Sequence, residues 1–224
     1  MARKILVINP NSLEEMTREI EAAIVPLRFA GGPSIECVTL AEGPPGINSQ
    51  QDGDSVIAPM LKLMRSREKD CAAFVIACYG DPGIDSMREA SSKPVFGIAE
   101  SGILTALTLG QRFGVIALSA KGVSRQLRKI ATFGVTERLA RILPLEMAAA
   151  DTLDEGKTYE RMVETGKSLR DRHGANVVVM GCAGMAAYRQ PLQRELGIPV
   201  VEPTQAAVGM ALARVQLNWE GAAA

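Results

Sequence analysis

The sequence predicts an α/β fold of two similar parallel-sheet halves, related by an approximate two-fold axis, with the active site in the cleft between them. Two observations lead to this prediction. Short apolar runs alternate with longer amphipathic stretches along the 224 residues, which is the pattern of successive βαβ units. A strand-and-helix pattern in the first half of the chain also returns about one hundred residues later, and such an internal repeat indicates a duplicated architecture.

The strand predictions rest on short apolar runs, several of them unbroken and rich in β-branched residues. Such runs are typical of strands that are buried on both faces of a parallel sheet. The predicted strands are Ile5–Ile8, Ile35–Thr39, Ala73–Ala77, Val95–Ile98, Gly114–Leu118, Ala140–Pro144, Val177–Met180 and Val200–Val201. Stretches with helical periodicity lie between them. The clearest of these are Ser12–Ile24, Asp54–Arg65, Gly122–Thr132, Tyr159–Arg172 and Thr204–Val215.

Two cysteine-containing segments carry the repeat. Ala73–Gly80 and Val177–Gly184 each consist of an apolar strand, a cysteine, one further residue and a glycine. A proline follows Cys78 by 16 residues and Cys182 by 17 residues, and in both copies an alanine lies 12 residues after that proline. We therefore expect two α/β domains, with the last helix packed back on the first half. The expected domains are 1–98 plus 204–224, and 99–203.

Composition and charge exclude several classes of protein. With 25 Lys and Arg against 25 Asp and Glu, the formal net charge is zero, so the chain lacks the basic footprint of a nucleic-acid or membrane-surface protein. The chain is 47% apolar and 22% charged, which excludes a disordered chain. No apolar run reaches the ~18 residues of a membrane span. The first apolar run is also shorter than the ~7–15-residue core of a signal peptide, so we expect a cytoplasmic protein.

The cysteine and histidine content limits the kinds of catalytic and metal site that the chain can form. The four cysteines are expected to be reduced thiols, and their spacing lacks the paired C-x-x-C of a zinc or redox site. His173 is the only histidine, which argues against a Ser-His-Asp enzyme and against a multi-histidine metal site. We therefore expect no metal site, and the partner we expect is a small-molecule substrate that is processed without a cofactor, for the reason given next.

Cys78 directly follows one predicted strand, and Cys182 follows another after one intervening residue. In parallel α/β sheets ligands bind beyond the carboxyl ends of the strands, so a two-fold relation between the halves would place the two thiols on opposite sides of one small ligand. A thiolate can remove a carbon-bound proton, and a thiol can deliver one. Such a pair inverts a stereocentre without a cofactor, and both cysteines are the predicted catalytic residues. Cys37 and Cys71 lack this context and are expected to be structural.

The residues around the two cysteines suit this chemistry. Asp81 is a predicted helix N-cap, with Pro82 at the first helical position. A helix N-terminus lowers the pKa of a neighbouring cysteine below its usual ~8.5, and its free backbone N–H groups can hold a developing enolate oxygen. The loop Asn9–Ser12 begins a further helix, and Ser119–Lys121 is its counterpart. Either loop can orient a substrate, and Asn9 and Ser12 can equally serve as helix caps.

Four segments that span nearly the whole chain resemble the Asp/Glu/hydantoin racemase superfamily, and within it the hydantoin and allantoin racemases. They are Ile8–Ser12, Ala77–Gly83, Pro94–Glu100 and Gly181–Met185. The resemblance implies two α/β domains, a cofactor-free two-base mechanism and a homo-oligomer, with Cys78 and Cys182 as the acid/base pair. It also implies that the loop at Gly46–Ile47 closes over a substrate site lined by Asn9, Ser12, Gly80, Asp81, Ala183 and Gly184.

The residues that follow the two cysteines narrow the expected substrate. Amino-acid racemases of the superfamily typically carry Asn-Thr and Thr-Glu or Thr-His there, whereas this chain has Tyr79-Gly80 and Ala183-Gly184. A compact ring that bonds to backbone N–H groups therefore fits better than a free amino acid. We expect a racemase that inverts the C5 stereocentre of a 5-substituted hydantoin or of allantoin. Further candidates for substrate contact are Ile47, Tyr79, Phe96, Ser119 and Met185.

Two alternatives stay open. A maleate-type cis-trans isomerase also uses two cysteines, one of which adds to a double bond, and it predicts activity on an unsaturated diacid. A non-catalytic small-molecule-binding domain on the same scaffold predicts that replacing either cysteine by alanine leaves ligand binding nearly intact.

Overall fold

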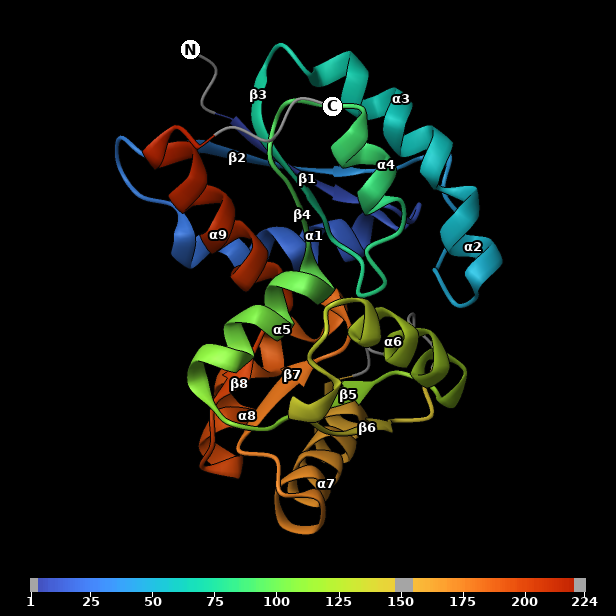
Figure 1. The fold of residues 1–224 in the computed structure, drawn as a ribbon, viewed down its shortest axis with the longest axis vertical. Coiled ribbons are helices and arrows are strands. Elements are labelled where there is room, and N and C mark those ends of the chain that lie inside the picture. The colour runs from blue at the N-terminus through green and yellow to red at the C-terminus, as the bar shows by residue number, and fades with distance from the viewer. Residues whose placement is uncertain (1–3, 148–154, 220–224) are drawn as a thin grey trace.

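The computed structural model describes residues 4–147 and 155–219. It contains two four-stranded sheets with the strand orders β2-β1-β3-β4 and β6-β5-β7-β8, and every pairing in them is parallel. Counted from the start of each half, the two orders are the same, and Figure 1 shows one half above the other. The predicted class of two similar parallel-sheet halves is confirmed. Parts of the predicted domains, at 1–3, 148–154 and 220–224, lie outside the described residues.

The elements follow the predicted order of strands and helices. The first half contains β1 (Lys4–Asn9), α1 (Glu14–Ile24), η1 (Val25–Leu27), β2 (Ser34–Thr39), α2 (Gln50–Ser55), α3 (Ile57–Arg67), β3 (Cys71–Ile76), α4 (Ile84–Glu89), β4 (Val95–Gly97) and α5 (Ile98–Leu109). The second contains β5 (Phe113–Ala117), α6 (Ala120–Thr132), η2 (Thr136–Arg138), β6 (Leu139–Pro144), α7 (Glu155–His173), β7 (Val177–Met180), η4 (Ala183–Tyr188), α8 (Arg189–Leu196), β8 (Val200–Val201) and α9 (Pro203–Leu217).

One predicted helix is two helices in the structure. The stretch Asp54–Arg65 was expected to be continuous, but α2 ends at Ser55 and α3 begins at Ile57. The start of α2 is fixed by a capping box: the Asp52 backbone N–H donates to Ser49 Oγ at 3.0 Å, and the Ser49 backbone N–H donates to Asp52 Oδ2 at 2.8 Å. This reciprocal pair places the beginning of a short helix four residues before the predicted one.

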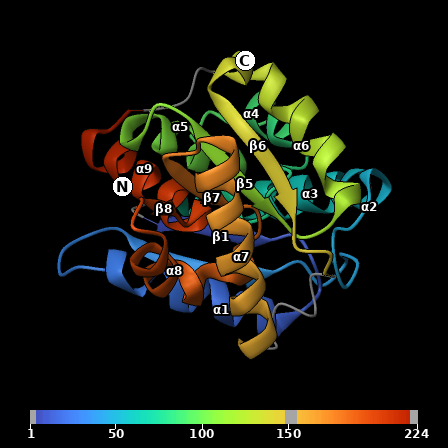
Figure 2. The same cartoon turned by 90° about the horizontal axis from the view of Figure 1, so that it is seen from below.

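The side chains of the central strands alternate between two faces of each sheet, and this divides the core into one inner and two outer layers. In β1, Ile5 and Val7 join the cluster shared by the two halves, whereas Leu6 and Ile8 face α3 and α4 in a separate cluster. Successive side chains of a strand point to opposite faces of the sheet, so an unbroken apolar run fills both layers at once. The second half repeats this arrangement, and Figure 2 shows α7 and α8 on the outer side of its sheet.

The helices α5 and α9 are exchanged between the two halves. α9 follows the last strand of the second sheet but packs against β1, β3 and β4 of the first sheet. α5 follows the last strand of the first sheet, and it contacts β5, β7 and β8 of the second. The two helices also pack against each other. The contacts of α9 agree with the expectation that the last helix packs back on the first half, and the domain bounds stay a prediction.

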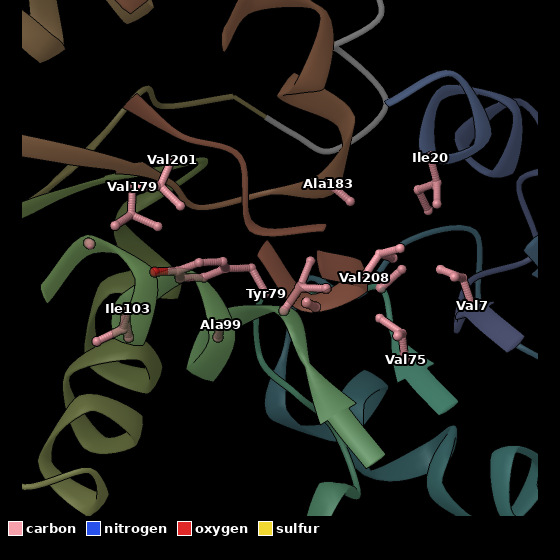
Figure 3. Close-up of a cluster of buried hydrophobic side chains, with 14 of the residues drawn as sticks. Val7, Ile20, Val75, Tyr79, Ala99, Ile103, Val179, Ala183, Val201 and Val208 are labelled. Atoms are coloured by element: carbon pink, nitrogen blue, oxygen red, sulfur yellow. The ribbon is translucent and has the colours of Figure 1, made fainter. Parts of the chain in front are cut away.

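The inner cluster is continuous across the boundary between the halves. Figure 3 shows Val7 and Val75 from the first sheet in one group with Val179 and Val201 from the second. Burial of this shared apolar surface stabilises the relative placement of the two sheets, at roughly 25 cal/mol per Å² of apolar area removed from water.

Among the described residues, no helix combines the length and the apolar character that a bilayer crossing requires.

Candidate active site

A cavity of about 650 Å³ lies between the two halves, and residues from both of them line it. Its wall includes the carboxyl ends of β3 and β7, where Ala77, Cys78, Gly181 and Cys182 lie. The volume is within the range of about 300–1,000 Å³ that small-molecule sites occupy. The expectation that the two cysteines face one cleft agrees with this placement.

Equivalent backbone hydrogen bonds place the two cysteines. The Ala77 backbone N–H donates to the Ile8 carbonyl at 2.8 Å, and the Gly181 backbone N–H donates to the Ile116 carbonyl at 2.8 Å. In each half a cysteine is the next residue. A Cβ on Gly181 would lie 2.4 Å from the Ile116 carbonyl oxygen, so this approach of two backbones requires glycine.

The protein raises the pKa of both thiols, contrary to the expectation from the sequence. Burial is the largest cause, and it raises the pKa of Cys78 to about 12 and that of Cys182 to about 11. The backbone N–H groups of Gly80 and Gly184 act in the expected direction and lower the pKa of their respective cysteines. Loss of hydration disfavours the charged thiolate more strongly than these N–H groups stabilise it.

The chain after Cys78 does not enter a helix at once, and the predicted N-cap role of Asp81 in that helix is wrong. The next helix, α4, begins at Ile84, with Gly83 as its N-cap at φ 67°. Pro82 therefore does not occupy the first helical position. Asp81 has φ 45°, a conformation in which aspartate is better tolerated than most residues.

Asp81 instead caps α5, a helix that starts 17 residues farther along the chain. Its carboxylate oxygens accept hydrogen bonds from the backbone N–H groups of Ala99 and Glu100, at 2.9 Å each. The first N–H groups of a helix have no partner within it, so a buried carboxylate satisfies two of them together. Burial is the largest cause of the pKa of Asp81 being raised to about 6, although both N–H groups act to lower it.

The cavity wall contains most of the predicted substrate-site residues. Those that line it are Ile47, Tyr79, Gly80, Asp81, Ser119 and Ala183. Tyr79 also packs its ring into the inner cluster, with its hydroxyl directed toward Val179 and Ile103 (Figure 3). Gly184 is buried next to the wall, and it contributes the N–H group near Cys182.

Asn9 and Ser12 are not among the described residues that line the cavity. The Asn9 side-chain amide donates to Asn11 Oδ1, to the Leu13 carbonyl and to Thr17 Oγ1, so it fixes the loop from within. Neither residue caps α1, because its N-cap is Leu13. Asn11 does line the cavity, and its Oδ1 accepts the Leu13 backbone N–H at 3.0 Å.

Sequence reasoning missed the basic face of α6. Arg125 and Lys129 are four residues apart, which puts them on one side of a helix, and both line the cavity. Arg125 Nη1 donates to the carbonyl of Asn48 at 2.9 Å, which joins α6 of the second half to the loop before α2 of the first. The positive charge of Arg125 also acts to lower the pKa of Cys78. Lys121, in the predicted Ser119–Lys121 loop, is exposed and outside the lining.

Comparison with known proteins gives matches that cover most of this chain. A family model described as Asp/Glu/Hydantoin racemase matches residues 5–211. The chain is 32% identical over 220 residues to a hydantoin racemase from Paenarthrobacter aurescens, covering 97% of this chain and 93% of that protein. It is 34% identical over 217 residues to a hydantoin racemase from Pseudomonas sp. (strain NS671), covering 96% and 87% of the two chains. The structure of an allantoin racemase from Klebsiella pneumoniae is similar with a TM-score of 0.89 and 29% identity, covering 99% of this chain and 91% of that one.

Proposed function

Because this chain belongs to the Asp/Glu/hydantoin racemase family and is an isomerase of the racemase type, we propose that it inverts the C5 stereocentre of a hydantoin ring. The substrate is a 5-substituted hydantoin or allantoin, in keeping with the names of its relatives. Cys78 and Cys182 are the two acid/base groups. No cofactor takes part in the proposed mechanism.

One observation carries this proposal: two thiols at equivalent positions of the two halves line one cavity. A non-catalytic binding domain has no need of such a pair. For inversion, one group must remove the proton from one face of the carbon while the other delivers a proton to the opposite face. The placement of two cysteines from opposite halves of a duplicated fold around one cavity supports this arrangement.

The proposed reaction begins with one cysteine as thiolate and the other as thiol. The thiolate takes the C5 proton, and the electron pair of the C–H bond moves into the ring as an enolate of the adjacent C4 carbonyl. The thiol of the second cysteine then gives its proton to C5 from the opposite face, which regenerates the carbonyl. Each turnover exchanges the protonation states of the two sulfurs, so the resulting form catalyses the reverse inversion.

The cavity offers stabilisation for the negative charge that develops during this step. Arg125 uses one N–H for Asn48, and its guanidinium has further donors for an oxygen of the ring. A fixed donor aimed at a developing charge, in a site with little water, is among the larger contributions to catalysis. Gly80 and Ala183, which follow the two cysteines on the wall, carry no side-chain donors, which favours a compact ring over a free amino acid.

Polarimetry of single enantiomers in heavy water tests this function. Solutions of a 5-substituted hydantoin and of allantoin are followed with the enzyme and with an enzyme-free blank, and proton NMR reports deuterium at C5. We expect rotation to decay to zero faster than in the blank, with deuterium entering C5. An unchanged rotation for every ring tested contradicts the proposal, and an assay on an unsaturated diacid then tests the maleate-type alternative.

A further inference from the structure

The buried carboxylate of Asp81 has a counterpart in the second half that no sequence motif pointed to. Glu202, which is 2% exposed, caps α9. Its Oε1 accepts the Thr204 backbone N–H at 2.9 Å, and its Oε2 accepts the Gln205 backbone N–H at 2.6 Å. Asp81, also 2% exposed, caps α5 in the same two-oxygen manner. Both helices that exchange between the halves therefore begin on a buried carboxylate.

The two carboxylates reach equivalent places by different routes. Gly97, at the end of β4, and Glu202, at the end of β8, are the N-caps of α5 and α9. Their backbones are alike, with φ −96° and ψ 142° at Gly97 and φ −88° and ψ 118° at Glu202. A Cβ on Gly97 would lie 2.2 Å from Cγ of Asp81. In the first half, the Asp81 carboxylate thus occupies the space that a side chain at residue 97 would fill.

These caps connect each cysteine-bearing sheet edge to a helix that packs on the opposite sheet. The Asp81 backbone N–H donates to the Cys78 carbonyl at 3.0 Å, while its side chain holds α5 against β7 and β8 of the second half. Glu202 follows β8, the neighbour of the strand that ends before Cys182. Its side chain holds α9, which packs against β1 and β3 of the first half.

We propose that Asp81 and Glu202 are reciprocal positioning residues, which fix Cys78 and Cys182 opposite each other by tying each cysteine-bearing edge to the exchanged helix. The proposal rests on the two-thiol function proposed above. Neither carboxylate reacts with the substrate in this account, and each of their oxygens accepts one N–H at the start of a helix. The requirement is for a carboxylate at the start of α5 and of α9, irrespective of the residue that supplies it.

A transplant of the carboxylate within the first half tests this requirement. Asp81→Gly removes the cap and tolerates the positive φ of that position. The double variant Asp81→Gly/Gly97→Glu returns a carboxylate from the position equivalent to Glu202, into space that the first change vacates. We expect Asp81→Gly to lower kcat about 100-fold, as for a displacement of about 1 Å at a reacting group, with a smaller effect on KM. We expect the double variant to recover most of that loss. Gly97→Glu alone places two side chains in one space, and we expect this variant to lose its activity.

Alkylation of the thiols provides a readout that needs no substrate. Iodoacetamide modification of each cysteine is followed by mass spectrometry in the parent and the variants. In their ionised forms, Asp81 and Glu202 act to raise the pKa of Cys78 and Cys182 respectively. We therefore expect Asp81→Gly to speed alkylation of Cys78, and Glu202→Gln to speed that of Cys182, in each case relative to Cys37 and Cys71 in the same molecule. The double variant restores the slow rate at Cys78.

The outcomes separate the positioning role from general destabilisation and from the proposed function. A folded Asp81→Gly protein with parental kcat and parental Cys78 alkylation overturns the proposal. A folded double variant that recovers neither property also overturns it. Equal acceleration at all four cysteines in either single variant reports loosening of the whole fold, and it overturns the local role. If the parent protein racemises no hydantoin, the proposed function is wrong. The alkylation measurements then still decide whether each carboxylate acts on the cysteine of its own half.

Discussion

Cys78 and Cys182 line the same cavity from opposite halves, and negative charge on Cys182 raises the pKa of Cys78. Two thiols that influence each other in this way resist carrying two negative charges at once. Because burial also raises both pKa values, to about 12 and about 11, both thiols favour the neutral form at neutral pH. The form that the proposed mechanism requires has one thiolate and one thiol.

The pH dependence of racemisation follows from these values. The fraction of enzyme with one thiolate rises about tenfold per pH unit as long as the pH is below the lower pKa. We therefore expect kcat/KM for racemisation to rise steadily between pH 7 and pH 9, after subtraction of the enzyme-free rate at each pH. Because kcat/KM reports groups of the free enzyme, a plateau that begins near pH 7 would contradict burial as the dominant influence on the two thiols.

The buried carboxylate of Glu202 predicts a fall in stability with rising pH. Its pKa is raised to about 7, mainly by burial, whereas in the unfolded chain it is near the ordinary value of about 4.3. Between these values the folded state keeps a proton that the unfolded state has lost, so the contribution to the free energy of unfolding is complete below about pH 4.3 and is lost as the pH rises through about 7. A shift of this size corresponds to about 4 kcal/mol.

Urea denaturation of Glu202→Gln and of the parent between pH 4 and pH 8 measures this contribution. We expect the free energy of unfolding of the variant to fall less steeply across this window. Glu195→Gln is a suitable control, because the hydrogen bond from Lys167 lowers the pKa of Glu195, in the opposite direction from the shift at Glu202. Parallel curves for the parent and Glu202→Gln would show that the buried carboxyl does not hold its proton as described.

The glycine before Cys182 is expected to tolerate no side chain. In Gly181→Ala the new Cβ would meet the Ile116 carbonyl oxygen, and overpacking of this kind costs about 1–3 kcal/mol. Because the displaced segment carries Cys182, racemisation should fall as well. Gly209→Ala, in α9, is a matched control with nothing within 4 Å of the added Cβ, and a helical glycine-to-alanine change stabilises by up to about 1 kcal/mol. Equal midpoints of denaturation for the two variants would contradict this reading.

Arg125 is expected to matter for both binding and reactivity. Arg125→Ala removes the hydrogen bond to the Asn48 carbonyl and a charge that favours the thiolate of Cys78. We expect kcat/KM to fall by about 100-fold, at the lower end of the about 10²–10³ that the loss of one donor to a developing oxyanion costs, the role proposed above for this side chain. Arg65→Ala, an exposed arginine at the end of α3 and outside the cavity, serves as the control. Equal activity of the two variants would remove Arg125 from the proposed mechanism.

The sequence is informative about this fold because parallel strands buried on both faces leave an uninterrupted apolar signal. Val177–Met180 and Val200–Val201 have the predicted bounds, and the offsets around Cys78 and Cys182 anticipated the repeated strand order. Side-chain partners across long sequence separations leave no such local signal. The position of Asp81 before a proline suggests that it caps the next helix. Its carboxylate instead caps α5, and it fits there because Gly97 has no side chain in that space.

The remaining differences at the site have a similar origin. Asn9 and Asn11 are both polar residues in one loop, and only the three-dimensional hydrogen bonds decide that the first stabilises the loop while the second faces the cavity. The effect of burial on the thiols likewise depends on the assembled halves. A cysteine beyond a strand, taken alone, resembles the exposed helix-terminal cysteines whose pKa is low.

The central claim is that two thiols act on opposite faces of one carbon, and deuterium exchange in Cys78→Ser and Cys182→Ser tests it most directly. Each variant is incubated in heavy water with each pure enantiomer of a substrate that the parent racemises, and C5 exchange is measured beside optical rotation. We predict that neither variant racemises above the blank. We also predict that the surviving thiol exchanges the C5 proton of only one enantiomer, with retention, and that the favoured enantiomer differs between the two variants. Racemisation at the parental rate by either single variant would contradict the two-thiol account.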